Sequence, residues 1–273
     1  MSDPYHGSDY NKVFIDSALL PWAEPNIVNE VDMRYSLDEI AVLSLLLINT
    51  NYCGEVLAPT KVILTRCFGR SPTREECKKL LEVVSSLAAR VNEKDRIVVF
   101  AQDDLSRLKP SAQLNVVVKY ERRQFVKGEK FVSLSYEEID AIRKLSANGS
   151  GRFVGMLCAF LSIKSHMRKI EYFHIADNKK HDGFTSFVAR STIAKEAGVS
   201  TRTVDSYISK FEKAGLIGFR SGRAGYTMNT YTIPANQWIL DAAEKQNAEE
   251  IKKIMGYAHT EEPIRHKRYG GVC

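Results

Sequence analysis

The sequence predicts a mixed α+β fold that is mainly helical and carries small β-sheets. Two observations support this prediction. Apolar residues recur at helical spacing behind recognisable helix-start signals, and the order helix, helix, helix, strand, strand occurs twice along the chain. The 273 residues, 44% of them hydrophobic, provide material for more than one core. We therefore expect two tandem domains of similar build.

The first copy of this order begins at a capping box. The Ser36 hydroxyl can accept a hydrogen bond from the amide of Glu39, whose carboxylate can reach back to the amide of Ser36. A later helix begins at Ser71-Pro72, because serine suits the cap and proline suits the first helical position. The elements expected in this copy are helices from 36, over 60–68 and from 71, and strands over 96–100 and 115–120.

The second copy opens with the same signals. A hairpin of residues 125–126 and 131–132 is expected to join the halves, and Ser135 with Glu138 forms another capping box. Ser150 can cap the next helix, whose core-facing residues are Phe153, Met156, Leu157, Phe160 and Leu161. The elements expected after a polar stretch over 169–183 are two short helices within 191–217, strands over 218–221 and 226–233, and a helix from 235 to about 257.

The two short helices within 191–217 are hinged at Gly198, which supplies the left-handed turn conformation that a residue with a Cβ resists. Ser191 and Ser200 are suited to cap the two helices. The inner face of the second helix is formed by Val204, Ile208 and Phe211. The packing side of this helix is thereby accounted for.

The outer face of the same helix is hydrogen-bonding and cationic: Arg202, Thr203, Ser206, Ser209, Lys210 and Lys213. Between residues 190 and 233 there are seven Lys or Arg against three Asp or Glu, although the whole chain has a net charge of only +6. These are the side chains that a helix needs in a DNA major groove. The same pattern also fits a helix that simply faces solvent, and this alternative stays open.

Residues Phe187 to Ile233 resemble a winged helix-turn-helix domain. The resemblance lies in "IAKEAGVSTRTVDSYISKFEKAGLI" and in the basic hairpin that follows. It implies that residues 201–214 are a recognition helix, which enters the major groove by its N-terminal half, and that the hairpin reaches the backbone or minor groove. The implied DNA-binding residues are Ser200, Thr201, Arg202, Thr203, Ser206, Tyr207, Lys210, Arg220 and Arg223. Of these, we expect Arg202, Thr203 and Ser206 at base edges, and Lys210, Arg220 and Arg223 at phosphates.

The first copy matches the same layout only by element order. Its third helix exposes Glu75 and Glu76 beside several bases, and these acids would repel phosphate. We therefore expect it to dimerise or to bind a protein partner. The expected organisation is an N-terminal arm over 1–35, a winged-helix-like domain over 36–122, a DNA-binding winged-helix domain over 123–234, and a C-terminal helix with a basic tail over 235–273.

Two winged-helix units in tandem are similar to the replication initiators of bacterial plasmids and phages. The resemblance implies a sequence-specific double-stranded DNA-binding protein that starts replication of a plasmid, phage or mobile element. Its expected partners are double-stranded DNA, replication proteins and a second copy of the chain as a homodimer. The alternative is a transcriptional regulator that binds an operator through the same helix.

Other functions find little support in the residues. The chain has no Walker A loop and no Gly-x-Gly-x-x-Gly after a strand, and we expect no enzyme activity and no cofactor. The five cysteines include no Cys-x-x-Cys pair, so neither disulfides nor a zinc ribbon are expected. His174, Asp177 and His181 could meet in a loop, but their spacing matches no familiar ligand pattern, so no metal is predicted. A nucleic-acid enzyme stays an alternative only if this cluster binds a metal. Without a membrane span or signal peptide in the pattern, we expect a cytoplasmic location.

Overall fold

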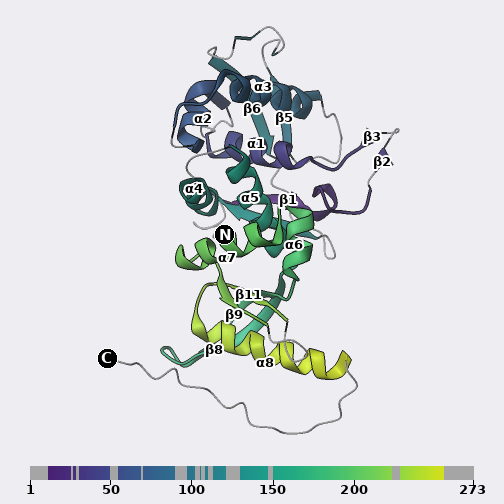
Figure 1. Ribbon diagram of the computed structural model, residues 1–273, viewed down its shortest axis with the longest axis vertical. Helices are drawn as coiled ribbons and strands as arrows, with labels where there is room; N and C mark the ends of the chain where they lie inside the picture. Colours follow the sequence, from purple (N-terminus) through teal and green to yellow (C-terminus); the bar gives the residue numbers. More distant parts are fainter. Residues whose placement is uncertain are drawn as a thin grey trace, which may run out of the picture.

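The computed structural model describes residues 12–25, 27–28, 31–49, 55–68, 70–89, 97–101, 105, 108–109, 113–120, 130–146, 150–222 and 228–254. These residues form a mixed α+β structure with small sheets, as the sequence predicts. It is elongated in Figure 1, with the first half of the chain at one end and the C-terminal helix at the other.

Two segments of the chain have the same topology. The first contains α1 (Leu37–Ile48), β4 (Glu55–Pro59), α2 (Thr60–Phe68), α3 (Arg74–Ala89), β5 (Ile97–Ala101) and β6 (Gln113–Tyr120). The second contains α5 (Ser150–Ser165), β8 (Arg168–His174), β9 (Lys179–Ser186), α6 (Arg190–Glu196), α7 (Thr201–Lys213), β10 (Gly218–Arg220) and β11 (Thr230–Ile233). We call these segments the first unit and the second unit. In each sheet the strand before the helix pair binds the last strand, giving the orders β4-β6-β5 and β9-β11-β10, with β8 added beside β9.

The two units share one core, which is centred on α1 and α5. Every residue over 40–47 in α1 and over 155–163 in α5 is buried. A helix that is apolar on all sides needs neighbours on all sides, and α1 packs between α3 and α5 (Figure 1). The second unit adds α6 and α7 against the other side of α5. The core-facing residues predicted for α5 are confirmed as buried.

Both predicted capping boxes are confirmed. The Ser36 Oγ accepts from the Glu39 amide at 3.2 Å, and Glu39 Oε2 accepts from the Ser36 amide at 2.7 Å. The helix α4 (Tyr136–Leu145) begins in the same way, at Ser135 and Glu138. Glu138 also forms a mostly buried ion pair at 2.7 Å with Lys164 of α5. The same carboxylate therefore caps the N-terminus of α4 and joins this helix to α5.

The start of α3 differs from the prediction. Its cap is Thr73 rather than Ser71, because Thr73 Oγ1 accepts from the Glu76 amide at 3.2 Å and Glu76 accepts from the Thr73 amide at 2.8 Å. Glu76 stands three residues after threonine, which completes a capping box that Ser71 cannot form. Pro72 therefore lies before the helix.

The N-terminal segment is more ordered than the predicted arm. The strand β1 (Lys12–Asp16) pairs antiparallel with β7 (Phe131–Ser135), in the connection between the units, and the short helix η1 (Ser17–Leu19) follows. Ile15, Leu20 and Tyr35 are buried in the shared core. A small ladder joins β2 (Ile27–Val28) to β3 (Val31–Asp32). The segment thus forms part of the body, and the first half of the hairpin predicted at 125–132 lies outside the described residues.

The strands β4, β8 and β9 were not predicted. The polar stretch 169–183 contains much of an antiparallel hairpin in which Tyr172 pairs with His181 and His174 with Lys179. Its outer face carries ion pairs between Lys169 and Asp182 at 2.8 Å and between Lys180 and Glu171 at 3.7 Å. Exposed charges on one strand face hide the alternation on which strand prediction depends.

The last helix, α8 (Gln237–Ile254), covers the sheet of the second unit at the bottom of Figure 1. Ile239 and Ala243 are fully buried against the strands. Asn247 is also fully buried, and its amide group bonds both the amide and the carbonyl of Met228. Among the described residues, no helix is both long and apolar enough to cross a bilayer.

Gly183 allows α8 to lie close to β9. A Cβ at this position would stand 2.1 Å from the Ile239 Cδ1 and 3.2 Å from the Ile233 carbonyl oxygen. We therefore expect Gly183→Ala to displace α8 and to lower the free energy of unfolding by about 1–3 kcal/mol, the usual cost of overpacking. Chemical denaturation measures it. The matched change, Asp182→Ala on the exposed face next to it, should cost clearly less, and equal losses would contradict this packing.

His166, after α5, joins that helix to α6 through Glu196. The His166 Nε2 lies 3.0 Å from a Glu196 oxygen, and the same carboxylate accepts from the buried Ser162 hydroxyl at 2.6 Å. The hydrogen bond to Glu196, which outweighs partial burial, raises the pKa of His166 above its ordinary value. The pair therefore stabilises the folded chain at low pH, and this contribution is lost as pH rises through the raised pKa.

The change His166→Gln should consequently cost more stability at about pH 5.5 than at about pH 8.5. The difference should stay below about 1 kcal/mol, since the imidazole is 40% exposed and water screens the pair. Denaturation of both proteins at both pH values measures it. A cost that does not change with pH, or that grows as pH rises, would show that the ion pair is not what stabilises this contact.

Candidate nucleic-acid interface

The turn between α6 and α7 forms largely as the sequence indicates. Gly198 has a φ of +64°, and the Ser200 Oγ caps α7 by accepting from the Thr203 amide at 3.1 Å. The inner face of α7 is confirmed, since Val204, Ile208 and Phe211 are buried. The prediction that Ser191 caps α6 is wrong, because the cap position is Ala189 and the helix has already begun at Arg190. The turn fixes which face of α7 meets solvent.

The outward face of α7 is polar and accessible. The predicted contact residues Ser200, Thr201, Arg202 and Ser206 are exposed, while Thr203 and Lys210 are half-buried. Ser209 and Lys213 extend the exposed row. The structure thus brings six of the nine predicted residues onto one continuous surface.

The charge of this surface depends on Arg190. Its Nε lies 2.9 Å from the Asp205 Oδ1, so an exposed acid of α7 is neutralised from α6. The guanidinium also lies over the Phe219 ring at 5.5 Å, which fixes its position. In the part of the chain that the structure describes, Arg202, Lys210 and Lys213 have no carboxylate partner. The other acid of α7, Glu212, is exposed and likewise unpaired among the described residues, so the three cations leave this helix with an excess of positive charge.

Arg152, which sequence reasoning did not single out, is a further exposed base of the second unit, in the first turn of α5. Burial raises the pKa of the Tyr207 hydroxyl, and the positive charge of Arg152 acts in the opposite direction. Arg152 is far from α7 in sequence, so no local pattern could have indicated it.

Tyr207 lies on the other side of α7. It is 6% exposed, and its hydroxyl would be 3.1 Å from a Cβ at Gly155 of α5. Gly155 thus makes room for the tyrosine between the two helices. We therefore count Tyr207 as a core residue and leave it out of the candidate interface.

Arg220, at the end of β10, faces α8. Its guanidinium forms an ion pair with Asp241 at 3.1 Å and a second, shorter one with Glu244. Partial burial alone would lower the pKa of Arg220, but the hydrogen bonds to these carboxylates raise it. The group that was expected at a phosphate is therefore occupied within the chain. Arg223, its expected companion on the hairpin, lies outside the described residues.

The corresponding helix of the first unit, α3, is different. Lys78 pairs with Glu82 at 3.4 Å, and Lys79 pairs with Asp38 of α1 at 2.8 Å. Just before the helix, Arg70 pairs with Glu76 at 2.7 Å. These three bases are compensated by acids of the same unit, whereas Arg74 of α3 and the bases of α7 have no carboxylate partner among the described residues. This difference favours a separate role for the first unit.

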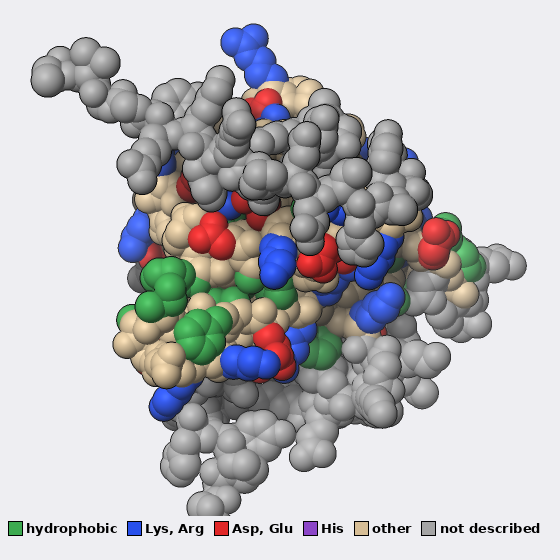
Figure 2. Space-filling model, turned by 90° about the horizontal axis from the view of Figure 1, so that it is seen from below, with side chains coloured by type: hydrophobic (Ala, Val, Ile, Leu, Met, Phe, Trp, Pro, Cys, Tyr) green, Lys and Arg blue, Asp and Glu red, His purple; other side chains and the backbone are tan. Residues whose placement is uncertain are grey.

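The face of the molecule at the α8 end has no dominant charge. Figure 2 views the molecule from the α8 end and shows Lys and Arg side chains interspersed with Asp and Glu, with some hydrophobic side chains gathered at one side. Exposed apolar residues near this end include Phe173, Ile175 and Phe184 on the β8–β9 hairpin. Neither sign of charge prevails on this face, which sets it apart from the outward face of α7.

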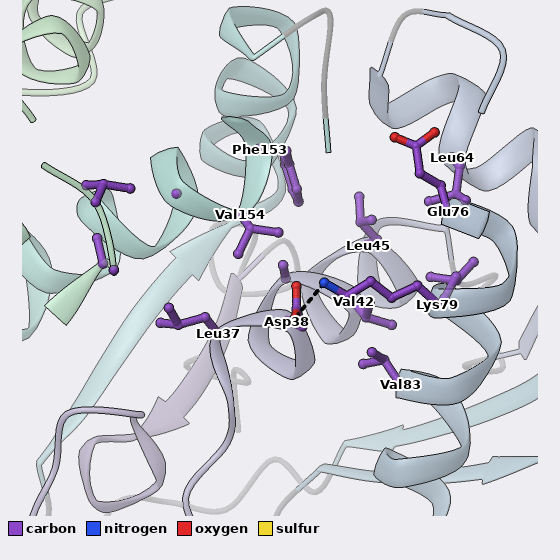
Figure 3. A pocket seen from close by; sticks show the side chains of 16 residues that line it. Leu37, Asp38, Val42, Leu45, Leu64, Glu76, Lys79, Val83, Phe153 and Val154 are labelled. Atoms are coloured by element: carbon purple, nitrogen blue, oxygen red, sulfur yellow. Dashed lines mark ion pairs between the residues drawn. The ribbon is translucent and has the colours of Figure 1, made fainter. Parts of the chain in front are cut away.

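A cavity of about 250 Å³ lies where the two units meet. It is bounded by α1 and α3 of the first unit and by α5 and the α6–α7 turn of the second (Figure 3). Its walls are mostly apolar, and its charged groups are Asp38, Lys79 and Glu76, all of which are already paired. We find no candidate nucleophile or general base among these lining residues.

One further cluster lies on the β8–β9 hairpin. His174, Asp177 and His181, for which the sequence predicts no metal, are brought together there with ligand atoms within 4.8 Å of one another. The hairpin register, which the sequence did not reveal, is responsible for this meeting.

The candidate interface thus consists of the outward face of α7. All of its residues are described from the structure of this chain, without a related protein for comparison. No protein-family model, curated protein or solved structure matches the sequence or the fold.

Proposed function

We propose that this chain binds double-stranded DNA sequence-specifically through α7 and initiates replication of a bacterial plasmid, phage or mobile element. The observation that carries the proposal is the outward face of α7, on which Arg202, Lys210 and Lys213 have no carboxylate partner among the described residues. An exposed row of uncompensated cations interleaved with hydroxyls is suited to phosphates and base edges.

The dimensions of α7 are compatible with a major groove. Its 13 residues span roughly 20 Å at 1.5 Å per residue, and the groove of B-DNA, about 12 Å wide, admits an α-helix. Arg202 and Ser206 lie in the first half of the helix and are assigned to base edges. Lys210 and Lys213 lie in the last turn and are assigned to phosphates on the groove edge.

The topology of both units supports a winged-helix interpretation. Each has a helix, a strand, two helices and two strands in this order, with the strand before the helix pair bound to the last strand, and the second unit adds β8 ahead of β9. In the second unit the helix pair is followed by the β10–β11 hairpin, in the position of the wing. In this interpretation Arg220 joins the sheet to α8 through Asp241 and Glu244. A phosphate contact from the wing would then be made by residues that follow Arg220 in the chain.

The contrast between α3 and α7 supports a division of roles. A first unit in which Lys78 and Lys79 of α3 are paired internally is assigned to protein contacts, with replication proteins or with a second copy of the chain in a homodimer. The protein would act by holding repeated DNA sites and recruiting other factors, with no chemical step of its own. The same α7 contacts would serve a regulator at an operator, so the genomic position of the bound sites separates the two roles.

The principal test is Arg202→Ala. We expect this change to relax base preference at one position of the site and to weaken binding to that site by about 1–3 kcal/mol, while affinity for random DNA changes little. Selection from a random DNA library, followed by titration of the selected site, measures both quantities. Lys78→Ala on α3 is the matched control and should leave binding unchanged. An equal loss on all DNA, or an equal effect of Lys78→Ala, would refute the assignment.

Arg220 and Lys210 should respond differently to removal of their charge. We expect Lys210→Gln to weaken binding to all sequences and to reduce the salt slope of log K by about 1. Arg220→Gln should instead leave the slope unchanged and lower the free energy of unfolding by roughly 1 kcal/mol, because Asp241 and Glu244 lose their partner. If Arg220→Gln reduced the slope as Lys210→Gln does, Arg220 would be a phosphate contact after all.

A further inference from the structure

We propose that the tip of the β8–β9 hairpin binds a divalent transition-metal ion through His174, Asp177 and His181. This site is separate from the face of α7 and does not depend on DNA binding. Each of the three residues offers one ligand atom, and these atoms lie within 4.8 Å of one another.

The hairpin itself brings the three residues together. Tyr172 pairs with His181, and His174 lies two residues beyond Tyr172, so alternation along the strands places both histidines on one face. Asp177 lies in the turn over 175–178 and accepts a hydrogen bond from the Lys179 amide at 3.2 Å. Asn178 has a φ of +53°, which allows the chain to reverse so soon after Asp177.

The distances are close to those that a metal ion requires. Asp177 lies between the histidines, with Oδ1 at 3.1 Å from the His174 Nδ1 and Oδ2 at 2.6 Å from the His181 Nε2. Ligand atoms about 2.0–2.1 Å from a tetrahedral ion are about 3.3 Å apart. Small side-chain rotations would therefore place an ion between the carboxylate and the two rings, where hydrogen bonds now join them.

The chemistry of the donors selects the class of metal. Two imidazole nitrogens with one carboxylate oxygen suit Zn²⁺, Co²⁺, Ni²⁺ and Cu²⁺, whereas Mg²⁺ and Ca²⁺ prefer oxygen ligands. The side chains are between 31% and 41% exposed, so an ion can enter from solvent. With three protein ligands, at least one position remains for water.

The surroundings connect the site to α8. The His174 ring meets the Trp238 ring edge to face at a centroid distance of 6.1 Å, and the His181 ring lies 5.8 Å from that of Tyr172. The Tyr172 hydroxyl in turn accepts a hydrogen bond from Asn236, just before α8. A bound ion would hold the hairpin tip against the beginning of α8.

Trp238 provides a direct test in the full-length protein. The chain has two tryptophans, and Trp22→Phe leaves Trp238 as the sole tryptophan, which can be excited selectively over the tyrosines. Titration with Ni²⁺ should quench its fluorescence to saturation, and calorimetry with Zn²⁺ should show one site per chain. We expect Asp177→Asn combined with His181→Gln, in the same background, to weaken both signals roughly tenfold or more, since even loss of an outer hydrogen-bond partner costs a metal site that much.

His166→Gln is the matched control. It removes another half-exposed histidine with a carboxylate partner, Glu196, but without a third ligand among the described residues, so binding should not change. Circular dichroism verifies that each variant is folded. The proposal is overturned if the parent shows no saturable quenching, or if the double variant binds Ni²⁺ and Zn²⁺ as the parent does.

Discussion

The packing of α1 against α5 is the contact on which the rest of the structure depends. Residues 40–47 of α1 and 155–163 of α5 are buried on all sides, so these parts of the helices would face water in the absence of the other unit. Their polar groups are satisfied locally, as when the Ser44 hydroxyl donates to the Ile40 carbonyl at 2.8 Å. Burial also raises the pKa of the Cys158 thiol to about 12, which keeps this core thiol protonated and unreactive. Two units of the same topology thereby share one interior and hold a fixed relative position.

Within this frame, the units differ in how their charges are compensated. In the first unit, bases of α3 and of the segment before it pair with neighbouring acids, whereas in the second unit a base of α6, Arg190, neutralises Asp205, one of the two acids of α7. The first arrangement makes a balanced surface, and the second leaves an excess of positive charge. Topology alone would not have separated the two units, because the difference lies in side chains on equivalent elements.

The sequence was most informative where structure is local. Capping boxes at Ser36 and Ser135 and helical periodicity in α5 and α7 located these helices, because such signals involve residues three or four apart. The strand β1 could not be found in this way, since its partner β7 lies far along the chain, and β8 and β9 were missed because exposed charges on one face hide their alternation. The same reason limited the site prediction. Periodicity identified the outward face of α7, but the burial of Tyr207 against α5 and the pairing of Arg220 with α8 depend on distant residues.

The pairing of β1 with β7 has a consequence for how the chain matures. During synthesis the start of the chain emerges first, but its strand partner belongs to the connection between the units, and the partner of α1 comes later still. Until α5 leaves the ribosome, α1 keeps an uncovered apolar side, so the first unit cannot complete its interior as a nascent domain. A fragment that ends before α5 would expose this apolar side of α1 to solvent and would be prone to aggregate. The two units are therefore distinct in topology, but we expect them to fold together once α5 has been synthesised.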